Sequence, residues 1–405
     1  MHITSKPLLI AFVLTIISGQ VAIADELERR QAKRIHDRLT GVPATNAVID
    51  TMEGLLVSDP SGKTAAAEAI KNPAFYNVTL KNFAAPWTNE EQTVFVPLND
   101  YTATVIGMIR DDVDFREVLY GDIIYTGNNS PAYADNSNAH YEAMENLGPV
   151  AGDLSNPSIL IKKTQSTVTG VGLANGAAAT AGVITTRAAA KSFFSDGTNR
   201  AMFRFTLMNH LCTDLEPLKD ISRVPDRIRQ DVSRSPGGDS RIFLNNCIGC
   251  HAGMDGMAGA YAYYEYDYTT DKETGSLSYI DGAVRGKHLI NSDNFKPGYA
   301  MTDDSWVNYW RNGQNWILGW GPSASLDAKG NATGNGAAEL GIELANSHAF
   351  AQCQVDKVFQ AVCFRDPNDY AADRSERDDI VTEFKNTGYQ MKQVFGDVAA
   401  WCKGN

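Results

Sequence analysis

Two thiols and an imidazole stand in one short run of the chain, Cys247-Ile248-Gly249-Cys250-His251. Thiols at this spacing can add to the two vinyl groups along one porphyrin edge, and the next residue then brings its imidazole under the iron. A redox disulfide would need a strand before the motif, where a helix is expected, and a zinc ribbon would need a second Cys-x-x-Cys pair. The motif therefore predicts one covalently bound haem c, attached through Cys247 and Cys250, with His251 as an axial iron ligand.

The residues before the motif favour a helix that would lie over the same porphyrin edge. Asp239 or Ser240 can cap its N-terminus, and Ile242 and Phe243 lie about one turn before the first cysteine. The spacing from Phe243 to the cysteines and histidine of the motif resembles the first helix of class I cytochromes c.

The sequence leaves three possibilities for the sixth iron ligand. Met301 lies fifty residues beyond His251 in a Pro- and Gly-containing loop, residues 296–302. This loop resembles the distal-ligand loop of class I cytochromes, and a thioether ligand would favour reduced iron and raise the potential. His288 is the rival ligand, and an open site is the third option.

The other histidines and methionines near these positions are expected to be structural. Met254 and Met257 follow His251 too closely to cross to the opposite haem face, so they should pack at its edge. A lone histidine is more often a hydrogen-bonded structural residue than a ligand. This expectation covers four residues: His36, His140, His210 and His348.

Residues 1–24 have the pattern of a secretory signal. Lys6 provides a basic start, an apolar run covers Leu8–Ser18, and Ala22-Ile23-Ala24 is a small-x-small cleavage site. The run is about eleven residues long, whereas a bilayer span needs about twenty. We therefore expect no transmembrane segment in the mature chain and a periplasmic or secreted protein.

The composition is that of an ordinary globular chain with an acidic surface. Apolar residues make up 43% of the 405 residues and charged residues 21%, and the formal net charge is −12. Nucleic acids and anionic lipids bind clustered Lys and Arg, so neither is an expected partner. A basic redox partner protein would be attracted to this surface.

Four cysteines lie outside the motif: Cys212, Cys353, Cys363 and Cys402. On one helix, Cys353 and Cys363 would be about 15 Å apart, beyond the reach of a disulfide of about 7 Å between Cα atoms. Cys212 and Cys402 are therefore their expected partners, in two bridges suited to an oxidising compartment. The sequence leaves the pairing open.

Hydrophobic periodicity predicts a mainly α, multi-helix protein. Helices are expected over the following ranges: 27–38, 51–58, 64–71, 98–111, 198–211, 337–363 and 380–402. Residues 125–157 are rich in Asn, Gly, Ser and Pro and predict a long surface excursion. We predict an N-terminal helical domain over 25–165, a cytochrome c-like haem domain over 166–322 and a C-terminal helical region over 323–405.

The tyrosine-rich run 261–268 follows the haem motif. Its alternation predicts a strand that pairs with residues 277–280 in a small β-hairpin. Farther on, Trp306, Tyr309 and Trp310 would share one face of a helix that Gly313 ends. That face should cover the haem pocket.

The haem motif and several other segments resemble the planctomycete-type cytochrome c-associated domains of unknown function. These segments are Phe115–Asp122, Gly182–Thr186, Leu211-Cys212, Cys247–Asp255, Tyr264–Asp267 and Leu344–Cys353. After Asp255 this chain has Gly256, where the family usually has proline. The resemblance implies haem redox chemistry outside the cytoplasm and names no substrate.

Two functions of different classes follow from the motif. The first is an exported mono-haem cytochrome that acts in electron transfer, because a loop methionine is available and no distal acid and base pair is evident. The second is a haem enzyme, peroxidase- or oxygenase-like, acting on a small molecule, because the chain is several times longer than a cytochrome c module. A third reading is a binding or scaffold protein in which the haem is only structural.

Overall fold

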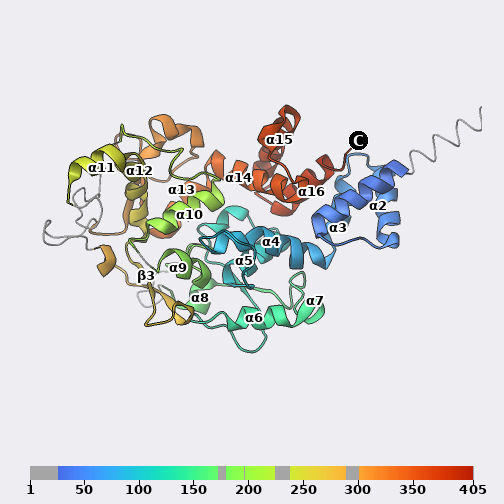
Figure 1. Ribbon diagram of the computed structural model, residues 1–405, viewed down its shortest axis with the longest axis horizontal. Helices are drawn as coiled ribbons and strands as arrows, with labels where there is room; N and C mark the ends of the chain where they lie inside the picture. The colour runs from blue at the N-terminus through green and yellow to red at the C-terminus, as the bar shows by residue number, and fades with distance from the viewer. Residues whose placement is uncertain (1–25, 172–178, 196, 224–237, 289–300, 405) are drawn as a thin grey trace, which may run out of the picture.

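A computed structural model describes residues 26–171, 179–195, 197–223, 238–288 and 301–404, and these are mainly helical (Figure 1). The predicted signal, residues 1–24, lies outside them. The N-terminal elements are helical residues 26–40, α2 (Asn46–Ser58), α3 (Lys63–Ile70), the π-helix η1 (Phe75–Leu80), α4 (Lys81–Ala84), η2 (Ala85–Thr88) and α5 (Asp100–Arg110). The predicted helices are confirmed here. The second begins earlier than expected because Thr45 caps it by accepting from the Val48 amide.

The predicted surface excursion over residues 125–157 is wrong in part. The elements of this region are η3 (Phe115–Val118), β1 (Ile124–Thr126), α6 (Ala139–Asn146), α7 (Gly148–Ala151), β2 (Ile161–Lys163) and α8 (Gln165–Thr169). Tyr125, Tyr141 and Met144 are buried in the core. A few large side chains therefore anchor a segment whose overall composition is that of a loop, and α6 forms around two of them.

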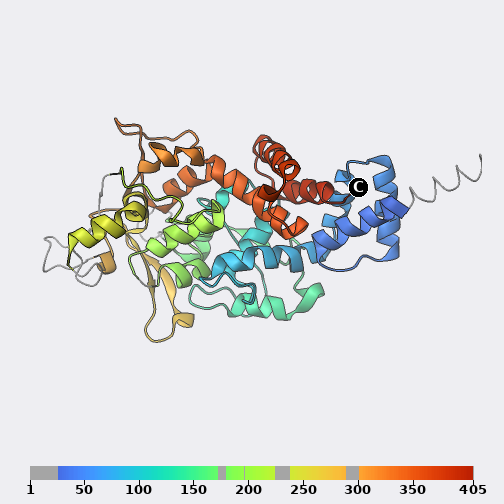
Figure 2. The same ribbon diagram turned by 45° about the horizontal axis from the view of Figure 1, so that its top comes forward.

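The haem motif lies among α9 (Arg187–Phe193), α10 (Arg200–His210), α11 (Ser240–Asn246), α12 (Ile248–Ala258) and η5 (Gly259–Tyr261). The predicted hairpin is confirmed as β3 (Tyr264–Asp267) paired antiparallel with β4 (Ser276–Tyr279), with η6 (Lys272–Thr274) between them and η7 (Gly286–His288) after them. In Figures 1 and 2, α11 and α12 lie at one end of the molecule, and α2, α3 and the C-terminus lie at the other.

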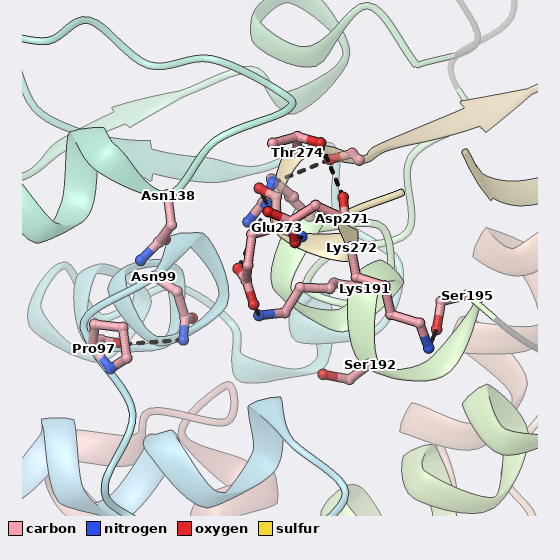
Figure 3. A network of polar contacts seen from close by, with 12 residues as sticks. Pro97, Asn99, Asn138, Lys191, Ser192, Ser195, Asp271, Lys272, Glu273 and Thr274 are labelled. Atoms are coloured by element: carbon pink, nitrogen blue, oxygen red, sulfur yellow. Dashed lines mark hydrogen bonds and ion pairs between the residues drawn. The ribbon is translucent and has the colours of Figure 1, made fainter. Parts of the chain in front are cut away.

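Polar contacts fasten this hairpin to α9 (Figure 3). The Lys191 ammonium binds the Glu273 carboxylate at 2.8 Å, and Lys272 donates to the Ser195 hydroxyl at 3.2 Å. Arg187 donates from Nε to the Gly275 carbonyl at 3.2 Å. The connection between β3 and β4 is therefore held against the helix that precedes α10.

The helix predicted to carry Trp306, Tyr309 and Trp310 on one face is wrong. Residues Ser305–Asn308 form strand β5, which pairs with β6 (Ala332–Asn335), and η8 (Tyr309–Arg311) and η9 (Gln314–Leu318) follow. The side chain of Asn308 ends the strand by accepting from the Trp310 amide. Alternation along β5 buries Trp306, and the turn after it buries Trp310.

Strand β5 packs on α12, and two glycines of the helix allow the approach. A Cβ at Gly256 would lie 2.8 Å from the Val307 carbonyl oxygen, and one at Gly253 would lie 1.9 Å from Trp310 Nε1. Gly256, where the resembling family usually has proline, lies inside α12, which continues to Ala258. The glycine at this position lets β5 approach the helix closely.

The two long C-terminal stretches are each divided. The elements are α13 (Gly336–Ala345), α14 (His348–Val358), the π-helix η10 (Phe359–Cys363), η11 (Pro367–Asp369), α15 (Ala371–Asn386) and α16 (Met391–Trp401). Ser347 starts α14 by accepting from the Phe350 amide, and the positive φ of 78° at Gly388 separates the last two helices.

Two disulfides confirm that the cysteines outside the motif pair with one another. Cys212 bonds to Cys353 and Cys363 bonds to Cys402, with Cα separations of 5.2 and 5.7 Å. The first bridge joins the end of α10 to α14, and the second joins η10 to the end of α16. As expected, Cys353 and Cys363 do not bond to each other.

One apolar core runs from Ala32 to Cys402 and takes residues from all three predicted segments. Helix α16 packs on α3, so the C-terminal helix lies beside the N-terminal helices (Figures 1 and 2). The boundaries at 165/166 and 322/323 stay predictions. Within the described ranges, no helix combines the length and apolarity that a bilayer crossing requires.

Candidate functional site

The two motif cysteines lie where α11 meets α12. Asp239 caps α11 by accepting from the Arg241 amide at 2.9 Å, and Cys247 separates the two helices. Neither Cys247 nor Cys250 is in a disulfide, and both are partly exposed. Burial raises the pKa of the Cys250 thiol, whose Sγ lies 3.7 Å from the Leu215 carbonyl oxygen. Both sulfurs are free to react.

His251 is held from one side by a buried carboxylate. Its Nδ1 lies 3.0 Å from Oδ2 of Asp255, one turn later on α12. Because an ionised carboxylate only accepts hydrogen bonds, Nδ1 carries a proton. Within the described part of the chain nothing hydrogen-bonds to Nε2, and the side chain is 30% exposed. Metal-binding histidines often have one nitrogen on a carboxylate and the other available in the same way.

Arg200, near the start of α10, keeps Asp255 charged. Its Nε and Nη2 donate to the two carboxylate oxygens at 2.6 and 2.7 Å. Asp255 is 1% exposed, and burial alone would raise its pKa. The charge of Arg200 and the hydrogen bonds outweigh burial, so the pKa of Asp255 is lowered. The result is a chain of contacts from Arg200 through Asp255 to His251.

Several apolar side chains near the motif in the chain or in space are exposed. Ile242 and Leu244 on α11 are 44% and 45% exposed, and Ile221, which is 79% exposed, approaches the helix beside Gly249. Phe243 is buried, with its ring centre 5.7 Å from that of His251. Ile242 and Phe243 therefore differ in burial, and their placement over one porphyrin edge stays a prediction.

The donor set and its surroundings fit a covalently held haem. Two free thiols at the required spacing, an imidazole with an unoccupied Nε2 and exposed apolar groups beside them are what a flat, apolar macrocycle with a central metal would use. The geometry equally permits a dithiol that bonds to itself, since the cysteines are one helical turn apart.

Met301 lies beside the hairpin in a small apolar cluster with Ala262 and Tyr263. It is 7% exposed, and the rest of its predicted loop, residues 296–300, lies outside the described residues. Ala262 follows His251 by eleven residues, beyond the end of α12. The described contacts of Met301 thus connect it to the hairpin and not to His251.

His288 is fully buried, and neither ring nitrogen has a hydrogen-bond partner within the described part of the chain. Burial lowers its pKa to about 4, and the positive charges of Lys287 and Arg200 add to this shift. The imidazole is therefore neutral and within electrostatic range of the arginine that holds Asp255. An unpartnered buried imidazole is unusual in a native protein.

The four histidines expected to be structural have protein partners. His36 Nδ1 is 3.3 Å from the Thr40 hydroxyl, and His140 Nδ1 is 2.8 Å from the Pro131 carbonyl oxygen. His210 Nε2 lies 2.8 Å from the Tyr101 hydroxyl, and His348 Nδ1 lies 2.8 Å from Lys385 Nζ. Met254 and Met257 are buried in the main core.

The roles of Asp255 and Arg200 were missed from the sequence. The four-residue interval between His251 and Asp255 was a usable signal, because such residues lie on one face of a helix. No signal pointed to Arg200, which meets Asp255 only through the packing of α10 on α12.

Searches of family models, curated proteins and solved structures found no match to this chain.

Proposed function

We propose that this chain is an exported mono-haem c-type cytochrome that transfers electrons. The observation that carries the proposal is the arrangement at α12, where two free thiols stand one turn apart beside an imidazole whose Nδ1 is bound to a buried carboxylate. When bound, the haem supplies a one-electron ferric/ferrous couple. Cys247 and Cys250 would form its thioether bonds, and His251 would bind the iron through Nε2.

The setting of the site supports electron transfer outside the cytoplasm. Two disulfides and a predicted secretory signal are typical of a periplasmic or secreted protein. The resemblance to planctomycete-type cytochrome c-associated domains agrees with this location. A net charge of −12 would attract a basic redox partner, and the exposed apolar groups beside the motif would let that partner approach the haem edge.

Attachment is tested by denaturing mass spectrometry of the exported protein. Thioether bonds survive acid and organic extraction, so every folded chain should carry the mass of one haem. Haem-free polypeptide with a disulfide between Cys247 and Cys250 would overturn the proposal, because the motif would then be a redox dithiol.

Met301 and His288 are the two proposed sixth ligands. The loop pattern favours Met301, whereas the unpartnered nitrogens favour His288, because ligation would satisfy a buried polar group. The ferric spectrum decides between them. A six-coordinate low-spin form should become high-spin in the alanine variant of the true ligand only, and a near-infrared sulfur band would identify Met301. If neither Met301→Ala nor His288→Ala changes a low-spin spectrum, both candidates are excluded.

The second candidate function is a haem enzyme with peroxidase- or oxygenase-like activity on a small molecule. The observation that favours it is the ionised Asp255 on His251, because a more basic ligand stabilises oxidised iron. A wild-type protein that is high-spin and consumes peroxide at enzyme-like rates would replace the electron-carrier proposal with this one. Negligible turnover in a low-spin protein would exclude it.

A further inference from the structure

We propose that Asp255 and Arg200 are positioning residues that make His251 a stronger donor to the iron and so lower the reduction potential of the site. This inference rests on the proposed haem attachment. It adds Asp255 and Arg200, which lie outside the five-residue motif, and it states their effect on the reduction potential.

The first step is the identity of the group that accepts from His251. A backbone carbonyl or a water would be a neutral acceptor, whereas Asp255 is a carboxylate paired with the cationic Arg200 guanidinium, whose Nε and Nη2 donate to its two oxygens at 2.6 and 2.7 Å. A negative acceptor draws the Nδ1 proton away from the ring and leaves more electron density on Nε2. A more basic Nε2 favours ferric over ferrous iron, so the potential falls.

The second step is rigidity. Asp255 is 1% exposed inside α12, and the Arg200 guanidinium is fixed further by donating to the Thr198 hydroxyl at 2.6 Å. Both carboxylate oxygens are therefore held, and Oδ2 accepts from Arg200 and His251 together. The position of the acceptor sets the direction of the His251 ring, which in turn sets where Nε2 points.

The chain contains a matched arrangement that does not contact the motif. Asp373, 4% exposed at the start of α15, accepts from Arg365 Nε and Nη2 at 2.5 and 2.9 Å. It also accepts from a ring N–H, that of Trp401, at 2.7 Å. This carboxylate has the same donors in kind as Asp255, but its ring partner is not an iron ligand.

The experiment compares the potentials of the haem-loaded variants Asp255→Asn and Asp373→Asn by optical redox titration. Asparagine keeps the size of the side chain and removes its charge. We expect Asp255→Asn to weaken the preference for ferric iron about tenfold, an upward shift of about 59 mV for one electron. Asp373→Asn should leave the potential at the wild-type value. Equal potentials for Asp255→Asn and the wild type would overturn the inference.

Arg200→Lys separates the charge of Asp255 from the general integrity of the site. Lysine keeps a cation but loses the two-pronged contact, so the Asp255 carboxylate is held less firmly against His251. The potential should then rise, by less than in Asp255→Asn. A potential at the wild-type value in this variant would overturn the role of Arg200, and this test does not depend on whether Asp255→Asn folds. Failure of the underlying function has a different signature, namely wild-type chain without covalent haem.

Discussion

The six cysteines fall in two regions of the molecule, one with disulfides and one with free thiols. Cys212 and three cysteines of the C-terminal region are joined in disulfides, and those three, Cys353, Cys363 and Cys402, are at most 5% exposed. At the junction of α11 and α12, Cys247 and Cys250 are unbonded and partly exposed. The exposed Ile242 and Leu244 lie on α11, the helix that ends at Cys247.

Bonding separates the structural from the reactive cysteines better than exposure does, because Cys212 is exposed and yet joined to Cys353. A sulfur in a disulfide has nothing further to bind, whereas a free thiol near exposed apolar groups has uncovered apolar surface beside it. We infer that the four disulfide cysteines stabilise the fold and that the motif cysteines hold a ligand.

The largest expected effect is an all-or-none difference between two pairs of serine substitutions. Cys247→Ser with Cys250→Ser should abolish covalent haem, because no sulfur is left to form a thioether bond. Cys363→Ser with Cys402→Ser should keep one haem per chain. Haem staining after denaturing electrophoresis measures both. Covalent haem in the first variant would erase the distinction between the regions.

Loss of a disulfide should act on stability alone. Removing either bridge should cost about 2–5 kcal/mol of unfolding free energy, mainly by releasing the unfolded chain. The Cys212–Cys353 bridge spans 141 residues and the Cys363–Cys402 bridge 39, so losing the first should cost about 1 kcal/mol more. Urea midpoints of the two serine pairs give the comparison. Wild-type midpoints in both would show that the bridges contribute nothing.

Beyond the motif, α12 is closely packed at Gly253, and a pair of glycine substitutions can test how tightly. At Gly253 a new Cβ would lie 1.9 Å from Trp310 Nε1, so Gly253→Ala should destabilise by about 1–3 kcal/mol. Gly54 on α2 has open space around it, so Gly54→Ala should stabilise by about 0.5–1 kcal/mol. Thermal unfolding distinguishes opposite signs. An unchanged unfolding temperature in Gly253→Ala would mean that α12 and β5 can move apart to accept the methyl group.

The smallest expected effect is the change in unfolding free energy with pH that the buried His210 causes. Burial lowers the pKa of His210 well below its ordinary value, and the charge of Lys357 adds to the shift. Below about pH 6.5, His210 therefore binds a proton in the unfolded chain but stays neutral in the folded chain. The unfolding free energy falls as the pH falls. From pH 7.5 to 5.5 this histidine should remove about 1.4 kcal/mol.

His210→Gln is the matching control for this prediction. Glutamine can still accept from the Tyr101 hydroxyl but does not titrate, so the loss of unfolding free energy over this pH interval should shrink by about 1.4 kcal/mol. An unchanged pH dependence would mean that other groups cause it.

Local patterns predicted most helices and the hairpin, because a cap or an alternation of side chains acts over a few residues. The errors occurred where packing overrides such patterns. Trp306 and Trp310 fit one helical face but lie in a strand and the turn after it, since β6 offers β5 a partner more than twenty residues away. Tyr141 and Met144 anchor a helix inside a segment whose composition suggests a loop.

The sequence by itself determined the Cys-x-x-Cys-His motif, the mainly helical class and the cysteines available for disulfides, because each depends on residue type and short spacing. Tertiary structure decided which cysteines pair, that Arg200 holds Asp255 against His251, and that His288 is buried without a partner. The long-range pairs among these features join residues 39 to 141 positions apart, and the burial of His288 depends on full enclosure, so only the packed chain produces them.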